Sequence, residues 1–213
     1  MQLILDNIKP IYLEQEKIND SEVWGKTIEI NQGEKIQIIA TSGRGKTSLV
    51  HFLYGLRNDY SGKILLNNKD LSQLSIDDFS SIRSREMSII FQDLRLFPEH
   101  TTEQNLAVKR DLHPFHTPET YSTMADRLGI KRKLSQQSKH CSYGEQQRTA
   151  IIRALQQPFH LLLMDEPFSN LDELNRAKAM TLINGEVEER KATVLLFDLK
   201  PIEYFQPDRI LYL

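Results

Sequence analysis

One glycine-containing segment has the residue types and spacing that hold a polyphosphate. The segment Thr41–Ser48 (TSGRGKTS) follows an apolar stretch, and the Lys–Thr pair within it opens a helical pattern. Such a turn directs successive backbone N–H groups inward, and the positive end of the following helix adds to them. We expect Lys46 to reach the β- and γ-phosphates and the Thr47 hydroxyl to ligate Mg²⁺. The expected phosphate-binding residues are Thr41, Ser42, Gly43, Arg44, Gly45, Lys46, Thr47 and Ser48.

A pair of carboxylates at the end of a second apolar stretch complements this loop. Leu161–Met164 is wholly apolar and is followed by Asp165 and Glu166. Asp165 is expected to complete the metal shell, usually through water, and Glu166 to polarise the attacking water. The loop and the carboxylate pair together predict a chain that binds ATP or GTP.

Composition narrows the class of protein. The chain has 213 residues and a net charge of −2, so nothing in its charge indicates nucleic acid as the main partner. Its apolar runs are far shorter than the roughly 20 residues that cross a bilayer, and its N-terminus lacks the pattern of a signal peptide. The single cysteine, Cys141, excludes an internal disulfide and favours a reducing compartment. We expect a cytoplasmic chain without a membrane anchor of its own.

The hydrophobic pattern alternates between strands and helices. Strand-like patterns occur at residues 3–5, 28–30, 36–39, 64–66, 87–91, 161–164, 193–197 and 210–213. Helical spacing covers 47–56 and 174–189, and polar helical segments dominate between about 93 and 157. Strands that alternate with helices predict an α/β fold, with a parallel sheet covered on both faces and a helical insertion in the middle.

Three further segments, in order, make the chain resemble the ATP-binding subunits of ABC transporters. They are Ile90–Asp93 (IFQD), Cys141–Arg148 (CSYGEQQR) and Pro167–Asp172 (PFSNLD), which correspond to the Q-loop, the signature and the D-loop of that family. The resemblance extends over essentially the whole chain. Phe91–Pro98, with Thr101–Leu106 behind it, looks most like the branch that serves lipoprotein release, cell division and macrolide export.

The resemblance implies a fold and an assembly. The fold is a P-loop NTPase (RecA-like) core with an antiparallel β subdomain and an inserted α-helical subdomain. Residues 1–213 would form a single ABC ATPase domain, with the core at about 1–92 and 158–213 and the helical subdomain at about 93–157. Two ATPase subunits are expected to close head-to-tail over two Mg-ATP, a homodimer being favoured over a heterodimer. The implied partner is an integral-membrane permease, which would hold the chain on the inner face of the cell membrane.

The signature segment has a physical logic of its own. Ser142 and Glu145 form the pattern of a capping box, which predicts a helix that runs to about Gln156. In the family the N-terminus of this helix faces the γ-phosphate bound by the opposite subunit, which implies that Ser142, Gly144 and Glu145 bind nucleotide. The D-loop adds Asp172 to the implied nucleotide-binding residues. The plainer alternative is a helix cap with no further role.

Further roles follow from the resemblance alone. Tyr12 lies where the family places an aromatic ring that stacks on adenine, although a tyrosine on a strand usually serves packing only. Gln92 is implied to contact Mg²⁺ and the attacking water, which makes it a catalytic residue beside Lys46 and Glu166. Leu94–Pro98 would help to form a groove for a cytoplasmic helix of the membrane partner, the alternative being ordinary core of the subdomain.

The chain departs from the family pattern at three positions. Ala40 replaces the first glycine of the phosphate loop and is expected to alter the entry to the loop, because alanine disfavours a left-handed backbone. Tyr143 replaces the first of two signature glycines, where it is expected to crowd the phosphate and to strain any left-handed backbone. Leu199 takes the place of a histidine that contacts the γ-phosphate, and losing such a donor costs roughly 10²–10³ in rate. Asp198 or Lys200 could replace it, and we expect slow hydrolysis.

Two rival functions stay open on the sequence. In a nucleotide-gated clamp, ATP holds the dimer closed and hydrolysis is negligible. Tyr143 and Leu199 favour this interpretation, whereas the retained Glu166 argues against it. A soluble ABC-type ATPase that acts on DNA or ribosomes is the other rival, but such chains usually carry coiled-coil insertions or a duplicated cassette, which this sequence lacks.

The remaining polar residues predict less. His113, His116 and His140 have no accompanying cluster of cysteines or carboxylates of the kind that builds a metal site. The charged run Glu186–Lys191 is interpreted as a solvated helix end. Cys141 replaces the usual leucine of the signature, so we expect a small buried hydrophobic residue there.

Overall fold

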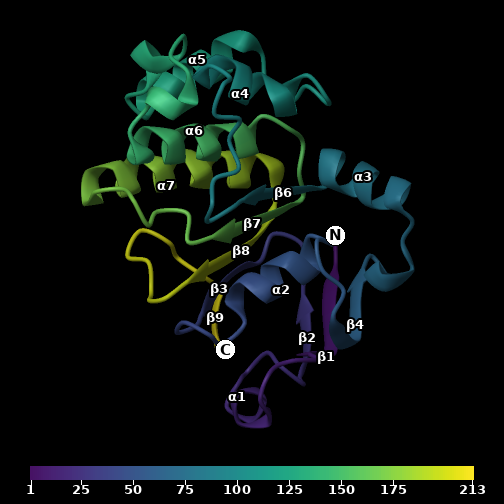
Figure 1. Cartoon of the computed structure of the whole chain (residues 1–213). Coiled ribbons are helices and arrows are strands. Elements are labelled where there is room, and N and C mark those ends of the chain that lie inside the picture. Colours follow the sequence, from purple (N-terminus) through teal and green to yellow (C-terminus); the bar gives the residue numbers. More distant parts are fainter.

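Two β-sheets organise the protein. The structure, a computed structural model, describes residues 1–213 and places a five-stranded parallel sheet next to a four-stranded antiparallel sheet (Figure 1). The parallel sheet, in the order β6-β7-β8-β3-β9, consists of β3 (Lys35–Ile39), β6 (Met87–Ile90), β7 (Leu161–Asp165), β8 (Thr193–Asp198) and β9 (Arg209–Tyr212). The antiparallel sheet, in the order β2-β1-β4-β5, consists of β1 (Leu3–Pro10), β2 (Thr27–Ile30), β4 (Tyr60–Leu66) and β5 (Lys69–Asp70).

Helices cover both faces of the parallel sheet. They are α1 (Gln15–Asn19), α2 (Lys46–Leu53), α3 (Ile76–Arg85), α4 (Thr102–Arg110), α5 (Pro118–Arg127), α6 (Tyr143–Leu155) and α7 (Glu173–Arg190), with 3-10 turns at Leu71–Gln73, Lys131–Lys133 and Ser138–His140. In Figure 1, α2 lies on one side of the sheet and α6 and α7 on the other, with α4 and α5 beyond α6. No helix is long and apolar enough to span a bilayer.

The buried strands supply two hydrophobic cores because their side chains alternate between the faces of the sheet. Leu161 and Leu163 of β7 join a cluster that includes the antiparallel sheet and α2. Leu162 and Met164, on the opposite face, join a second cluster with α4, α5, α6 and α7. Such wholly apolar strands are typical of a parallel sheet that is covered on both faces. The expected α/β fold, including the antiparallel sheet and the helices inserted between β6 and β7, is confirmed.

The parallel strands end together at one edge of the sheet. The phosphate loop follows β3, Gln92 follows β6, Glu166 follows β7 and Leu199 follows β8. Because parallel strands share their carboxyl edge, segments that are far apart in the sequence converge there. This edge is therefore where the predicted chemistry has to take place.

The charged run at the C-terminal end of α7 is a solvated helix end only in part: Glu188, Glu189 and Lys191 are exposed, whereas the side chains of Glu186 and Arg190 are largely buried. The side chains of Glu186 and Arg190 are 10% and 3% exposed, respectively, and form an ion pair. His116 contacts the same carboxylate at 2.7 Å, and the Arg190 guanidinium lies 3.9 Å from the ring centre of Phe115. The run ties the loop before α5 to α7, a long-range pairing that local charge pattern does not reveal.

Two of the expected backbone distortions are absent. Neither Ala40 nor Tyr143 has a positive φ, so alanine and tyrosine carry no left-handed strain at these positions. The Ala40 N–H donates to the Asp198 carbonyl at 3.1 Å and thereby continues the pairing of β3 with β8. Tyr143 is the first residue of α6. Any effect of Tyr143 must come from its bulk rather than from its backbone.

Candidate nucleotide-binding site

The phosphate loop has the backbone of an anion cradle. Gly43 and Gly45 are left-handed, with φ values of 80° and 92°, and a Cβ on Gly45 would meet the Trp24 ring at 3.0 Å. Gly45 also caps α2, and no side chain accepts a hydrogen bond from the first turn of that helix. The helix N-terminus therefore keeps its N–H groups available for an anion.

A cavity of about 420 Å³ brings together residues from four parts of the sequence. It is lined by Thr41, Ser42, Gly43, Gly45, Lys46, Thr47, Ser48, Gln92, Glu166 and Leu199. All the expected loop residues except Arg44 are among them. The Arg44 carbonyl instead accepts a hydrogen bond from Trp24 Nε1 at 3.0 Å, and its guanidinium lies 3.5 Å from Asp20.

The three expected catalytic side chains are in direct contact. Lys46 Nζ forms an ion pair with Glu166 Oε1, and Gln92 Nε2 donates to Glu166 Oε2 at 3.3 Å. Both members of the ion pair are largely shielded from solvent, with side-chain exposures of 8% and 15%. Glu166 also has a φ of 45°, an uncommon conformation for a residue with a Cβ and one that clusters at functional sites.

The expected metal ligands meet on one side of the loop. Thr47, Gln92 and Asp165 all line a second cavity, of about 340 Å³. Asp165 Oδ1 is buried and has no hydrogen-bond partner. Burial raises the pKa of Asp165 to about 6, and the nearby Lys46 opposes the rise. A buried, unpartnered carboxylate oxygen beside a hydroxyl and an amide fits a hard divalent cation that prefers oxygen ligands.

Tyr12 lies beside the loop, though not as a free stacking platform. Its hydroxyl contacts Ser48 Oγ, and the Arg57 guanidinium lies 5.0 Å from the centre of its ring. The side chain is about half exposed, at 48%. One face of the ring is thus covered by a cation.

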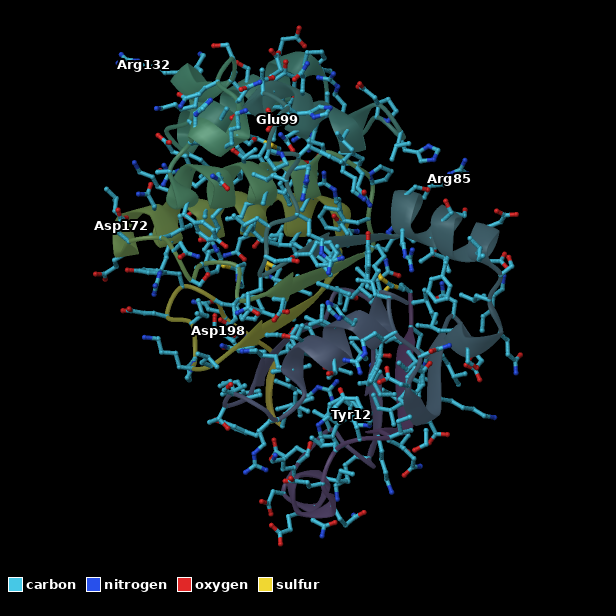
Figure 2. The ribbon with its side chains drawn as sticks, in the orientation of Figure 1. Tyr12, Arg85, Glu99, Arg132, Asp172 and Asp198 are labelled. Carbon is cyan, nitrogen blue, oxygen red and sulfur yellow. The ribbon has the colours of Figure 1, made fainter.

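The nucleotide-binding residues expected from the signature and the D-loop lie outside the two cavities of their own chain. Ser142 Oγ accepts from Glu145 N at 3.3 Å, and Glu145 Oε2 accepts from Ser142 N at 2.8 Å, which completes the predicted capping box. Asp172 caps α7 by accepting from Asn175 N at 2.8 Å. In Figure 2, Asp172 projects at the outer end of α7, well away from Tyr12. Ser142, Glu145 and Asp172 line neither cavity described above.

Gly144 is needed for space. A Cβ there would lie 3.1 Å from the Asn170 carbonyl oxygen, because the start of α6 packs against the D-loop. Gln147, one turn further along α6, reinforces this contact: its Nε2 donates to the Pro167 carbonyl at 2.7 Å and its Oε1 accepts from Asn170 N at 2.9 Å. The sequence alone assigns no role to Gln147. Only the structure shows that this amide is wholly buried, and a buried amide requires specific hydrogen-bond partners.

The positions that depart from the family pattern sit close to the expected chemistry. Leu199 lines the phosphate-loop cavity and is 51% exposed. Lys200 instead lines a separate cavity with Arg176. Burial raises the pKa of Asp198, which accepts from Leu199 N at 2.7 Å. Tyr143 is 50% exposed and lines the cavity of the expected metal ligands.

Comparisons with known proteins identify the family of the chain. The family model described as ABC transporter matches residues 25–169. The lipoprotein-releasing system ATP-binding protein LolD of Psychrobacter arcticus is 30% identical over 89% of this chain and 85% of its own length, and it belongs to the branch that the motifs indicate. The thiamine import ATP-binding protein ThiQ of Haemophilus influenzae is 33% identical over 91% of this chain and 89% of its own.

A solved structure shows the same fold. A dimeric post-hydrolysis structure of the ATP-binding cassette MJ0796, bound to ADP and Pi, matches with a TM-score of 0.81 at 24% identity, over 100% of this chain and 94% of its own. Fold, motif order and family match point the same way. The chain therefore belongs to the ABC transporter family, as one of its ATP-binding ATPase subunits.

Proposed function

We propose that this subunit binds Mg-ATP in its phosphate-loop cavity and hydrolyses it between two copies of the chain to drive an integral-membrane permease. One observation carries the proposal: Lys46, Gln92 and Glu166 meet at the carboxyl edge of the parallel sheet, over an uncapped helix N-terminus. The loop residues bind the phosphates, and the ring of Tyr12 stacks on the adenine base. Thr47, Gln92 and Asp165 hold the metal ion.

The contacts of Glu166 support a part for it in the reaction. When a triphosphate enters, Lys46 exchanges its ion pair with Glu166 for the β- and γ-phosphates. The freed carboxylate accepts a hydrogen bond from the attacking water and directs it in line with the bond that breaks. Thr47, Gln92 and Asp165 would hold a bound Mg²⁺, which would supply positive charge to the phosphate oxygens. Gln92, already within 3.3 Å of Glu166, keeps the water in place.

The second half of each site comes from another copy of the chain. Ser142 and Gly144 lie at the start of α6 and do not line their own cavity, which suits contact with a nucleotide held by a partner. Glu145 and Asp172 flank that contact. We favour a homodimer, in which α4 and α5 belong to a helical subdomain at about 93–157 and the core spans about 1–92 and 158–213.

The names of the relatives support a membrane partner. LolD and ThiQ are ATP-binding proteins of a lipoprotein-releasing and a thiamine import system, respectively. We propose that this chain likewise docks on a permease at the inner face of the membrane. The stretch Leu94–Pro98 contributes to the docking groove, because it leads from Gln92 to the inserted helices.

A nucleotide-gated clamp is the second candidate. Leu199 lines the cavity where the family uses a histidine, and a leucine side chain cannot donate a hydrogen bond to the γ-phosphate. Lys200 lines a different cavity, which argues against it as a replacement for that histidine. In the clamp, ATP closes the dimer and hydrolysis plays no part in opening it.

Steady-state Mg-ATPase activity of the chain, purified with its permease, separates the two candidates. Wild type and Glu166→Gln are compared at saturating ATP. Activity that disappears in the variant supports the motor. Equal activity in both proteins, with ATP still bound, rules out the motor and leaves the clamp.

A further inference from the structure

The loop that follows Gln92 has an unusual backbone. Leu94 and Arg95 are both left-handed, with φ values of 58° and 48°. Two consecutive residues with side chains in this region are disfavoured, because Cβ crowds the carbonyl oxygen. Such a backbone persists only where the surrounding structure holds it.

Arg153, on α6, supplies that support. Its Nη2 donates to the Leu94 carbonyl at 2.6 Å and its Nη1 to the Arg95 carbonyl at 2.7 Å. The residue is only 9% exposed, and both of its guanidinium hydrogen bonds go to backbone carbonyls rather than to a carboxylate. Burial lowers the pKa of Arg153 to about 10, which leaves the guanidinium charged at neutral pH. A buried cation whose only hydrogen-bond partners are two successive carbonyls fixes the path of that backbone.

The hydrogen bonds of Arg153 hold the loop that carries Gln92, the residue in contact with the carboxylate of Glu166. Gln92 lies two residues before Leu94, and its Nε2 is 3.3 Å from Glu166 Oε2. We propose that Arg153 is a positioning residue for ATP hydrolysis, which holds the loop so that Gln92 faces Glu166. The inference rests on the proposed ATPase function. Because α6 begins at the signature, contact of its N-terminus with the partner's nucleotide would reach Gln92 through Arg153.

The chain offers a matched control for this arginine. Arg83, on α3, also donates to two successive backbone carbonyls, those of Tyr54 at 3.0 Å and Gly55 at 2.7 Å. That pair lies at the end of α2, and Arg83 donates no hydrogen bond to the loop after Gln92, although the Tyr54 ring packs against Phe91. Arg153→Lys and Arg83→Lys each keep the charge but lose the planar fork that spans two carbonyls.

A double-mutant cycle of kcat tests the proposal in the full chain. Arg153→Lys is expected to lower kcat at least about tenfold, since small displacements of reacting groups cost up to about 10² in rate, while KM changes less than about twofold. In the Gln92→Ala background the same substitution is expected to change kcat by less than about twofold. Arg83→Lys is expected to retain kcat in both backgrounds. A wild-type kcat in Arg153→Lys, or the same loss with and without Gln92, overturns the proposal.

A measurement without turnover separates this proposal from the ATPase function itself. The side-chain amide signals of Gln92 in a heteronuclear NMR spectrum are identified by their loss in Gln92→Ala. They are expected to shift in Arg153→Lys and to stay in place in Arg83→Lys. If the wild type shows no activity above Glu166→Gln, the ATPase proposal fails. The Gln92 signals alone then decide whether Arg153 positions Gln92. Unchanged signals in Arg153→Lys overturn the positioning role.

Discussion

The helices α2 and α6 are both expected to present their N-termini to phosphate, yet they begin in different ways. Gly45 starts α2 without any side-chain cap, so the first N–H groups stay available. Ser142 and Glu145 start α6 with a complete capping box, which satisfies two donors within the chain. A helix that is left uncapped is ready for an anion, whereas a self-capped helix must first give up its own contacts.

The N-termini of α2 and α6 also differ in the charge of the side chains beside them. Lys46 stands at the start of α2, whereas Glu145 occupies the first turn of α6. Burial tends to raise the pKa of Glu145, but the hydrogen bonds from Ser142 and the nearby Lys133 lower it overall, so the carboxylate stays ionised at neutral pH. A γ-phosphate that approaches α6 meets this negative charge, and Tyr143 adds bulk beside it. In the proposed site we therefore expect phosphate to be held more strongly at the phosphate loop, the strong end, than at the signature, the weak end.

The largest effect is expected when the lysine of the phosphate loop is removed. Lys46→Ala removes the only lysine that lines the cavity, and we expect ATPase activity to fall by at least about 10², in line with the loss of one electrostatic donor. ATP affinity, measured by calorimetry, should fall as well. Lys17→Ala, which removes an exposed ion pair with Glu14 at 3.0 Å, is the control and should change neither quantity. Retained affinity in Lys46→Ala would contradict this site.

The second-largest effect is expected when a hydrogen-bond donor is added to the phosphate-loop cavity. Leu199→His restores a hydrogen-bond donor to the lining of the cavity, and we expect kcat to rise by about tenfold or more. Lys200→His introduces the same side chain one residue further on, beside a different cavity, and should leave kcat unchanged. A comparable rise in both variants, or in neither, would show that position 199 does not face the γ-phosphate.

Tyr143 tests the bulk at the weak end. Tyr143→Gly opens the approach to α6, and we expect kcat to rise by a few fold despite a helix cost of about 0.5–1 kcal/mol for glycine. Thermal unfolding measures that cost independently of activity. Tyr143→Ala should give most of the gain, because the backbone at this position is not left-handed. A gain with glycine but not with alanine would mean that backbone freedom, rather than space, limits the site.

The sequence predicts the residues of the phosphate loop far better than the tertiary contacts that hold the site in place. The phosphate loop and the pair Asp165-Glu166 are short local patterns, and parallel strands bring such patterns to one edge. The contacts of Gln147 and Arg153 join α6 to loops that are distant in the sequence, and no local pattern indicates them. The ion pair of Lys46 with Glu166 likewise depends on how β3 and β7 are placed in the sheet.

Two kinds of element escaped the pattern analysis for physical reasons. α3 has no fully buried residue, and its apolar residues Phe79 and Ile82 are only partly buried against the core, so its helical signal is weak apart from the capping box of Ser75 and Asp78. The strained pair Leu94 and Arg95 carries no glycine to mark the turn. Tertiary contacts impose that conformation, and only the structure reveals it.

The smallest predicted effect isolates charge at the weak end. Glu145→Gln keeps the capping box, since glutamine serves at this position as well, but removes the negative charge from the first turn of α6. Charges at a helix N-terminus are worth about 0.3–1 kcal/mol, so we expect ATP-dependent dimerisation to tighten by about two- to fivefold. Sedimentation velocity in the Glu166→Gln background, at low salt, measures this change. Glu188→Gln, which removes an exposed carboxylate 3.8 Å from Lys35, controls for net charge. If both variants tighten the dimer equally, long-range repulsion rather than the signature helix sets the difference between the two ends.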